Sequence, residues 1–121
     1  MIYTTYFAKL NKLPSYIVPI SICSKAPNGY KGLQYKKLAP GYDLLMKYKQ
    51  DHDSNYYIKN YNERVLASLD AQTILKELTN MANTESIALI CYEKPTDFCH
   101  RHLVSEWFRN NGIDCYEADL R

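Results

Sequence analysis

The chain has 121 residues, of which 46% are hydrophobic and 23% charged, and its formal net charge is +2. This length is typical of one domain of roughly 100 to 150 residues, and the composition excludes a mainly disordered chain. We therefore expect a single globular domain over residues 1–121. No apolar run reaches the roughly 20 residues that span a bilayer, and the first residues lack the pattern of a signal peptide. The sequence thus predicts a cytoplasmic protein with no membrane partner.

Two strands and a long loop are predicted in the first third of the chain. Residues 2–8 and 16–23 are rich in β-branched and aromatic side chains. Pro19 cannot donate a ladder hydrogen bond, so it suggests an edge strand or a bulge. The prolines and glycines of residues 24–41 predict a long ordered loop without a regular element.

Helices are predicted next, over residues 42–50 and 54–68, where apolar side chains recur at helical spacing. Asp70 is a good N-cap for a third helix over residues 71–82, whose apolar residues form one stripe. The apolar run 87–92 is typical of a central parallel strand that helices cover on both faces.

A helix over residues 98–110 and a strand over residues 113–116 complete the chain, with a turn at Asn111 and Gly112 between them. Together the elements predict a three-layer α/β sandwich with a mostly parallel sheet of about four strands. Parallel crossovers are right-handed, but the first connection is too short to fix the orientation of the first two strands.

The segment from Glu93 to Arg101 follows the predicted central strand. Ligands of open α/β sheets collect at the carboxyl ends of the strands, where helix N-termini also point. If Thr96 or Asp97 caps the helix, its first backbone N–H groups are unpaired donors at the positive end of the helix dipole. The sequence therefore predicts an anion site here, with Asp97 as structural support.

Helical phase assigns different roles to the triplet Cys99-His100-Arg101. The buried stripe of this helix is expected to contain Leu103, Val104 and Trp107. At about 100° per residue, such a stripe centres about 90° from Cys99. His100 then points inward, while Cys99 and Arg101 lie on the two margins of the stripe and face a cleft.

Each site residue has a functional role and a structural alternative. Cys99, near a helix N-terminus and an arginine, is a candidate nucleophile or a small buried hydrophobe. Glu93 is a candidate general acid or base, and Arg101 a bidentate ligand of a phosphate or carboxylate, unless the two form a structural ion pair. His100 is expected to support the site by bonding a loop carbonyl.

The cysteines are interpreted as reduced thiols because they lack the tight spacing of a zinc ribbon or a secreted scaffold. A metal site of Cys91, Cys99 and His100 matches no standard zinc spacing, and Cys91 is expected inside a strand. We therefore predict neither a metal nor a cofactor. Cys23 and Cys115 are expected to be core residues.

The site segment also resembles a known signature. An apolar strand ending in Cys-x-Glu, with a Cys-His-Arg triplet opening the last main helix, is characteristic of the uncharacterised family called domain of unknown function four-eight-eight. The matching residues are Leu89-Ile90-Cys91-Tyr92-Glu93-Lys94, Cys99-His100-Arg101 and Leu103.

This resemblance implies a compact Rossmann-like sandwich, and it implies Glu93 and the triplet as site residues without naming an activity. Many members end the second strand in Asp-Val-Arg, whereas the corresponding place here is Ser21-Ile22-Cys23. A carboxylate and a guanidinium expected in the cleft are therefore missing, which puts catalysis by this chain in question.

The first functional hypothesis is a protein that binds a phosphorylated, nucleotide-like or other anionic small molecule around Glu93 and the triplet. Arg101, Lys25 and Lys31 would bind the anion, and Cys99 or Glu93 would do any chemistry. Whether the protein is an enzyme, which reaction it performs and its oligomeric state stay open.

The alternatives use the Lys- and Tyr-rich loop over residues 25–42. In a nucleic-acid-binding module, its lysines would contact phosphates and its tyrosines would stack on unpaired bases. The residues concerned are Lys25, Lys31, Lys36, Lys37, Tyr30, Tyr35 and Tyr42. A protein-interaction domain without catalysis is the other alternative, because tyrosine is favoured at protein interfaces.

Overall fold

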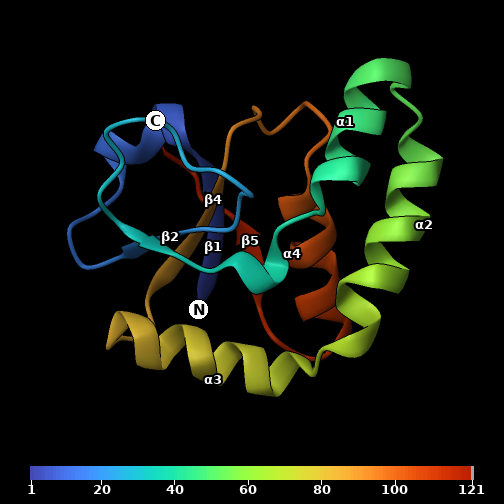
Figure 1. Ribbon diagram of the computed structural model, residues 1–121. Coiled ribbons are helices and arrows are strands. Elements are labelled where there is room, and N and C mark those ends of the chain that lie inside the picture. Colours follow the sequence, from blue (N-terminus) through green and yellow to red (C-terminus); the bar gives the residue numbers. More distant parts are fainter. Residues whose placement is uncertain (121) are drawn as a thin grey trace.

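The computed structural model describes residues 1–120 and has a five-stranded sheet in which every pairing is parallel (Figure 1). The strands lie in the order β3-β2-β4-β1-β5. Their bounds are β1 Ile2–Tyr6, β2 Val18–Ser21, β3 Leu33–Gln34, β4 Ile87–Cys91 and β5 Cys115–Glu117. The predicted α/β class is confirmed, with five strands in place of about four.

One face of the sheet is covered by the α-helices. Buried residues from each of them join one core with Ile87, Leu89 and Cys91, the alternate residues that share a face of β4. The helices are α1 Tyr42–Asp51, α2 Ser54–Arg64, α3 Ala71–Ala82 and α4 His100–Asn110 (Figure 1). Within residues 1–120, no helix has the length and apolar character needed to cross a membrane.

The other face carries a thinner layer. The crossover from β1 to β2 runs across the sheet in the opposite direction to the crossover from β3 to β4, so right-handed connections place the two on opposite faces. The first crossover contains the 3-10 helix η1, Phe7–Lys12. The Phe7 ring packs against the rings of Tyr30 and Tyr92, with centroids 5.4 and 5.0 Å apart.

Pro19 sits in an inner strand without breaking the ladder. The N–H groups of Val18 and Ile22 donate to the carbonyls of Ser86 and Ile90, on the β4 side of β2. Since successive residues alternate sides, the ring nitrogen of Pro19 faces the β3 side, and β3 pairs only from Ile20 onward. β2 is therefore an inner strand of the sheet, but on its β3 side Pro19 has no paired neighbour, as at an edge strand.

The prediction of a loop without regular elements over residues 24–41 was wrong. β3 adds to the sheet, and its end is fixed by the Tyr35 N–H, which donates to the Ser21 carbonyl at 2.8 Å. A 3-10 turn, η2 Lys36–Leu38, follows. Further along, α2 ends at Arg64 and the 3-10 turn η3 Leu66–Ser68 replaces the predicted end of that helix.

The helix α3 agrees closely with its prediction. The Asp70 carboxylate accepts hydrogen bonds from the backbone N–H of Thr73 at 2.9 Å and from its hydroxyl at 2.8 Å. The predicted stripe supplies Ala71, Ile74 and Leu78 to the core. A good cap and an amphipathic stripe thus act together on the same helix.

Tyr61 ties α2 to the segment that follows β3. Its fully buried ring carries a hydroxyl that donates to the carbonyl of Leu38 in η2. Tyr61→Phe should therefore lower the free energy of unfolding by about 1 to 2 kcal/mol, because it leaves a buried carbonyl without that donor. Urea denaturation measures this loss. Tyr42→Phe is the control, since the Tyr42 side chain is exposed at the start of α1, and an equal loss in both variants would contradict the prediction.

Candidate functional site at the start of α4

The functional-site candidate lies where β4 leads into α4. β4 ends at Cys91, and α4 begins at His100 with Cys99 as its extended N-cap residue. The prediction that Thr96 or Asp97 caps this helix was wrong, because the helix starts two residues later than expected. Asp97 instead closes a turn in the preceding loop, where its backbone N–H donates to the Lys94 carbonyl at 3.0 Å. Its predicted support of the site stays a prediction.

His100 is held inside the protein by a backbone carbonyl. Its Nε2 lies 2.7 Å from the Ile22 carbonyl oxygen, just beyond β2, and its ring packs against that of Tyr61. A carbonyl can only accept, so Nε2 carries a proton and donates it. Nδ1 is then the ring nitrogen next to the Cys99 sulfur.

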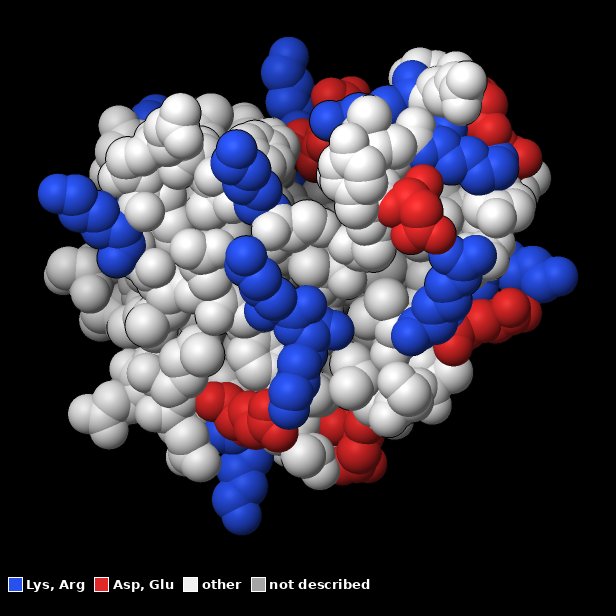
Figure 2. All heavy atoms as spheres, in the orientation of Figure 1, with Lys and Arg blue, Asp and Glu red and all other residues white. Residues whose placement is uncertain are grey.

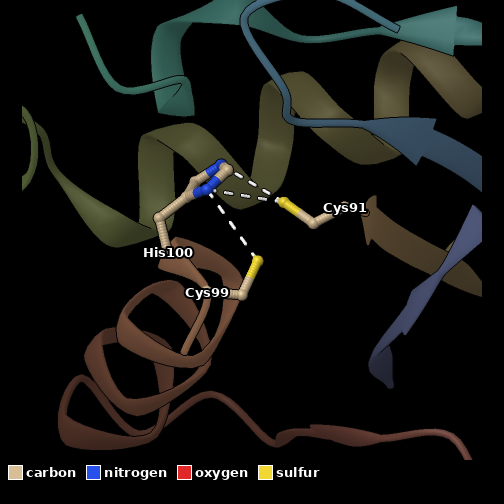
Figure 3. A group of neighbouring side chains, drawn as sticks. All are labelled: Cys91, Cys99 and His100. Atoms are coloured by element: carbon tan, nitrogen blue, oxygen red, sulfur yellow. Dashed lines mark hydrogen bonds between the residues drawn. The ribbon is translucent and has the colours of Figure 1, made fainter. Parts of the chain in front are cut away.

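Two thiols surround the His100 ring (Figure 3). The Cys91 sulfur lies 3.4 Å from both ring nitrogens, and the Cys99 sulfur lies 4.0 Å from Nδ1. One ligand atom from each of the three residues falls within 4.8 Å of the others, and all three side chains are buried. The structure thus brings together an imidazole and two thiols that come from separate elements.

The electrostatics of this group favour a thiolate at Cys99. The neighbouring Cys91 thiol, the His100 ring and the backbone N–H of Arg101 lower the pKa of Cys99 to about 3, against the opposing effect of burial. Burial raises the pKa of Cys91 well above its ordinary value, so Cys91 stays protonated. Burial alone would lower the pKa of His100, but Cys99 and the Ile22 carbonyl raise it. The group therefore supports a thiolate–imidazolium pair.

A small cavity of about 40 Å³ leads to Cys99 and His100. Its other walls are largely aromatic or aliphatic, apart from Glu93. They consist of Leu45, Tyr48, Tyr57, Glu93 and Phe98. Loss of water around the Glu93 carboxyl and the nearby negative Cys99 raise the pKa of Glu93. Glu93 is therefore more easily protonated than an ordinary carboxylate beside the thiol.

Arg101 does not face this cavity, and its expected place on a cleft margin was wrong. The side chain is fully buried: Nε and one terminal nitrogen each donate to the Glu117 carboxylate at 3.1 Å. The other terminal nitrogen donates to the backbone carbonyl of Glu93 at 2.6 Å. The structural alternative, an ion pair between Arg101 and the Glu93 carboxylate, was also wrong. Arg101 pairs with the Glu117 carboxylate and contacts Glu93 through its backbone carbonyl.

The physical reason is the phase of α4. Its buried residues centre about 170° from Cys99, not about 90°, when taken at 100° per residue. They are His100, Arg101, Val104, Ser105 and Phe108. Leu103 and Trp107 turn toward α2 and line a surface hollow with Ile58 and Leu66. Arg101 and Ser105 face β5, although hydrophobic periodicity assigns these two polar residues to the surface.

The lysines of the loop over residues 25–42 do not line the cavity beside Cys99. Lys25 and Lys31 are exposed, and Figure 2 shows basic side chains spread over one face of the molecule with acidic groups beside several of them. Their binding of an anion stays a prediction.

The tyrosines of the same loop are mostly occupied. The Tyr35 ring is buried and its hydroxyl donates to Glu77, while the Tyr30 hydroxyl donates to the Leu33 carbonyl. Only Tyr42 of the three stacking candidates is largely exposed. The nucleic-acid hypothesis therefore loses two of its three proposed base-stacking side chains.

Sequence reasoning missed Glu117 and underestimated Cys23. Glu117 lies on β5 next to β1, where Thr4 also donates to its carboxylate at 2.8 Å. Cys23 follows β2, which pairs with β4. Its pKa is lowered, and the contact with Cys91 at the end of β4 is the main cause. The order of the strands brings both residues to the site, and no local sequence signal states that order.

Comparisons with known proteins agree with the signature at β4 and α4. No curated protein and no solved structure matches the chain. The sequence profile described as the active DUF488-N3 subclade matches residues 9–112, which includes both elements that form the site. The chain therefore belongs to the DUF488 family, the domain of unknown function four-eight-eight.

Proposed function

We propose that the protein is an enzyme that uses the Cys99 thiolate as a nucleophile. The observation that carries this proposal is the position of Cys99, which lines a small cavity, is the N-cap residue of α4 and lies beside Nδ1 of a fixed imidazole. A nucleophile, a base in reach and a third group that orients the base form the usual arrangement for covalent catalysis. Here the Ile22 carbonyl is the orienting group.

The arrangement supports a two-step reaction. In the first step, the Cys99 sulfur forms a bond to an electrophilic carbon, and the leaving group departs with the proton of a protonated Glu93. In the second step, water attacks the same carbon and breaks its bond to sulfur, and Glu93 takes a proton from that water. The thiolate and the protonated Glu93 are then restored, so protons and electrons balance over the cycle.

The cavity limits what can react. A volume of about 40 Å³ holds about one small group beside the sulfur, and its aromatic walls suit a part of the substrate that carries no charge. Arg101 is fully buried, and each of its three nitrogens already donates a hydrogen bond to Glu117 or to the Glu93 carbonyl. We therefore assign recognition of any anionic part of the substrate to the surface outside the cavity.

A generic ester tests the proposal. Metal-free protein is incubated with p-nitrophenyl acetate, and the acetylated cysteine is identified by peptide mass spectrometry. We expect one acetyl group on Cys99 and a rapid first release of p-nitrophenol. Cys99→Ala should abolish both results. The matched control is Cys115→Ser, because Cys115 is also buried but lies in β5, and burial raises its pKa to about 11.

Two results would overturn the proposal. One is an unchanged release of p-nitrophenol by Cys99→Ala. The other is acetylation of Cys115 at the same rate as Cys99 in the folded wild-type protein. In either case the enclosed thiol is a core residue and the protein has no cysteine nucleophile at this site.

A further inference from the structure

We propose that Cys91, Cys99 and His100 also form a binding site for a zinc-like divalent metal ion. This inference rests on the positions of the ligand atoms alone. It stands whether or not Cys99 reacts with a substrate.

The separations between these atoms suit a shared ion. Around tetrahedral zinc, with Zn–S near about 2.3 Å and Zn–N near about 2.05 Å, sulfur and nitrogen ligands lie about 3.6 Å apart. The Cys91 and Cys99 sulfurs lie 3.4 and 4.0 Å from Nδ1, on either side of that value. Two sulfur ligands would be about 3.8 Å apart, and these sulfurs lie within 4.8 Å of each other. Figure 3 shows the Cys91 sulfur facing both ring nitrogens and the Cys99 sulfur facing one of them.

The Ile22 carbonyl supplies a second, independent argument. Histidines that bind metals usually donate their other ring N–H to a carbonyl or carboxylate, which fixes the tautomer and the direction of the ring. His100 already makes this bond through Nε2, at 2.7 Å. Nδ1 is then the ring nitrogen that would bind the ion, and it would release its proton on binding.

The three residues form a set of two sulfurs and one nitrogen. Cys2His is a ligand set of zinc sites that keep the fourth position for water or substrate. The spacing of these residues matches no zinc motif because they come from two separate elements, with Cys91 at the end of β4 and Cys99 and His100 at the start of α4.

The site can be reached from solvent. The cavity that ends at Cys99 and His100 is the path by which an ion would enter. A bound ion would use the Cys99 sulfur, so occupancy of this site would block the proposed reaction of Cys99 with a substrate.

Cobalt is the probe for the first test, because tetrahedral Co²⁺ bound to thiolates absorbs visible light strongly. Titration of the reduced, metal-free protein with CoCl₂ should give a thiolate-to-cobalt band and tetrahedral visible bands at one equivalent, and ZnCl₂ should abolish them. Cys91→Ser should weaken Co²⁺ binding at least about 100-fold. Cys115→Ser should leave binding unchanged, since Cys115 lies on β5 outside the group.

A second measurement needs no variant and so does not depend on whether Cys91→Ser folds. ZnCl₂ at one equivalent should protect Cys91 and Cys99 of the wild-type protein from alkylation, as read by peptide mass spectrometry, relative to Cys115. Absence of both the cobalt bands and the zinc protection would overturn the proposal. Acetylation of Cys99 in metal-free protein is measured separately, so failure of this proposal and failure of the enzymatic one are distinguishable.

Discussion

Replacing Arg101 by methionine should lower the free energy of unfolding by about 3 kcal/mol, the largest stability effect that we expect from a single substitution outside the apolar core. The guanidinium is fully buried and donates to the Glu117 carboxylate and to the Glu93 carbonyl. Methionine fills much of the volume but leaves the carboxylate without its charged partner. The Glu117 side chain keeps 26% of its surface exposed, so water offsets part of the loss and the value lies at the low end of the range for buried pairs.

Urea denaturation with matched variants tests this prediction. Arg64→Met is the control, because Arg64 pairs with Asp43 in an exposed ion pair, and such pairs contribute little to stability. The double variant Arg101→Met with Glu117→Leu should be more stable than Arg101→Met alone, since it removes the unpaired carboxylate as well. Equal stability of Arg101→Met and Arg64→Met would show that the buried pair contributes no more than a surface pair.

The same substitution links the fold to the site. Arg101 ties the end of β5 to the loop after β4 through Glu117 and the Glu93 carbonyl. Its loss should therefore loosen the wall of the cavity that holds Glu93. Arg101 acts in our interpretation as a positioning residue for the candidate site, which explains why an arginine next to Cys99 need not touch a ligand.

The elements that were predicted well are those in which several local signals agree. β4 is a continuous apolar run whose side chains are buried on both faces of the sheet. α3 combines an N-cap at Asp70 with one apolar stripe. β3 shows the opposite case. Leu33 and Gln34 have no alternating pattern, and they pair only because β2 offers backbone groups opposite Ile20 and Ser21. Such a strand is a tertiary effect, and residue propensities do not predict it.

The candidate site can be proposed from the sequence, but its internal arrangement cannot. The β4–α4 segment and Cys99 are candidates because of a strand end and a helix start, which are local features. The placement of Arg101 was mispredicted because periodicity counts apolar residues, and Arg101 and Ser105 are polar residues buried against polar groups of β5. The contact of Cys23 with Cys91 depends on β2 lying next to β4, and only the topology of the sheet shows it.

His100→Gln should change how the reactivity of Cys99 depends on pH. In the wild-type protein the pKa of Cys99 is lowered, by the Cys91 thiol and by His100, so the thiolate is present throughout pH 5 to 8. The rate of alkylation of Cys99 by a small methanethiosulfonate in metal-free protein should therefore vary less than about threefold over this range. Glutamine can still donate from its amide nitrogen to the Ile22 carbonyl, but it carries no positive charge beside the sulfur.

In His100→Gln the pKa of Cys99 should rise, and the thiol should be increasingly protonated as the pH falls. The rate of alkylation at pH 5 should then be at least about tenfold lower than the rate at pH 8. The ratio of these two rates is the useful measure, because a thiolate with a higher pKa is also intrinsically more nucleophilic and absolute rates partly compensate. Cys115 provides the internal reference, since it lies outside the group and burial keeps it protonated. A flat profile in His100→Gln would mean that the imidazole does not hold the Cys99 thiolate, and that the Cys91 thiol and the helix N-terminus stabilise it without His100.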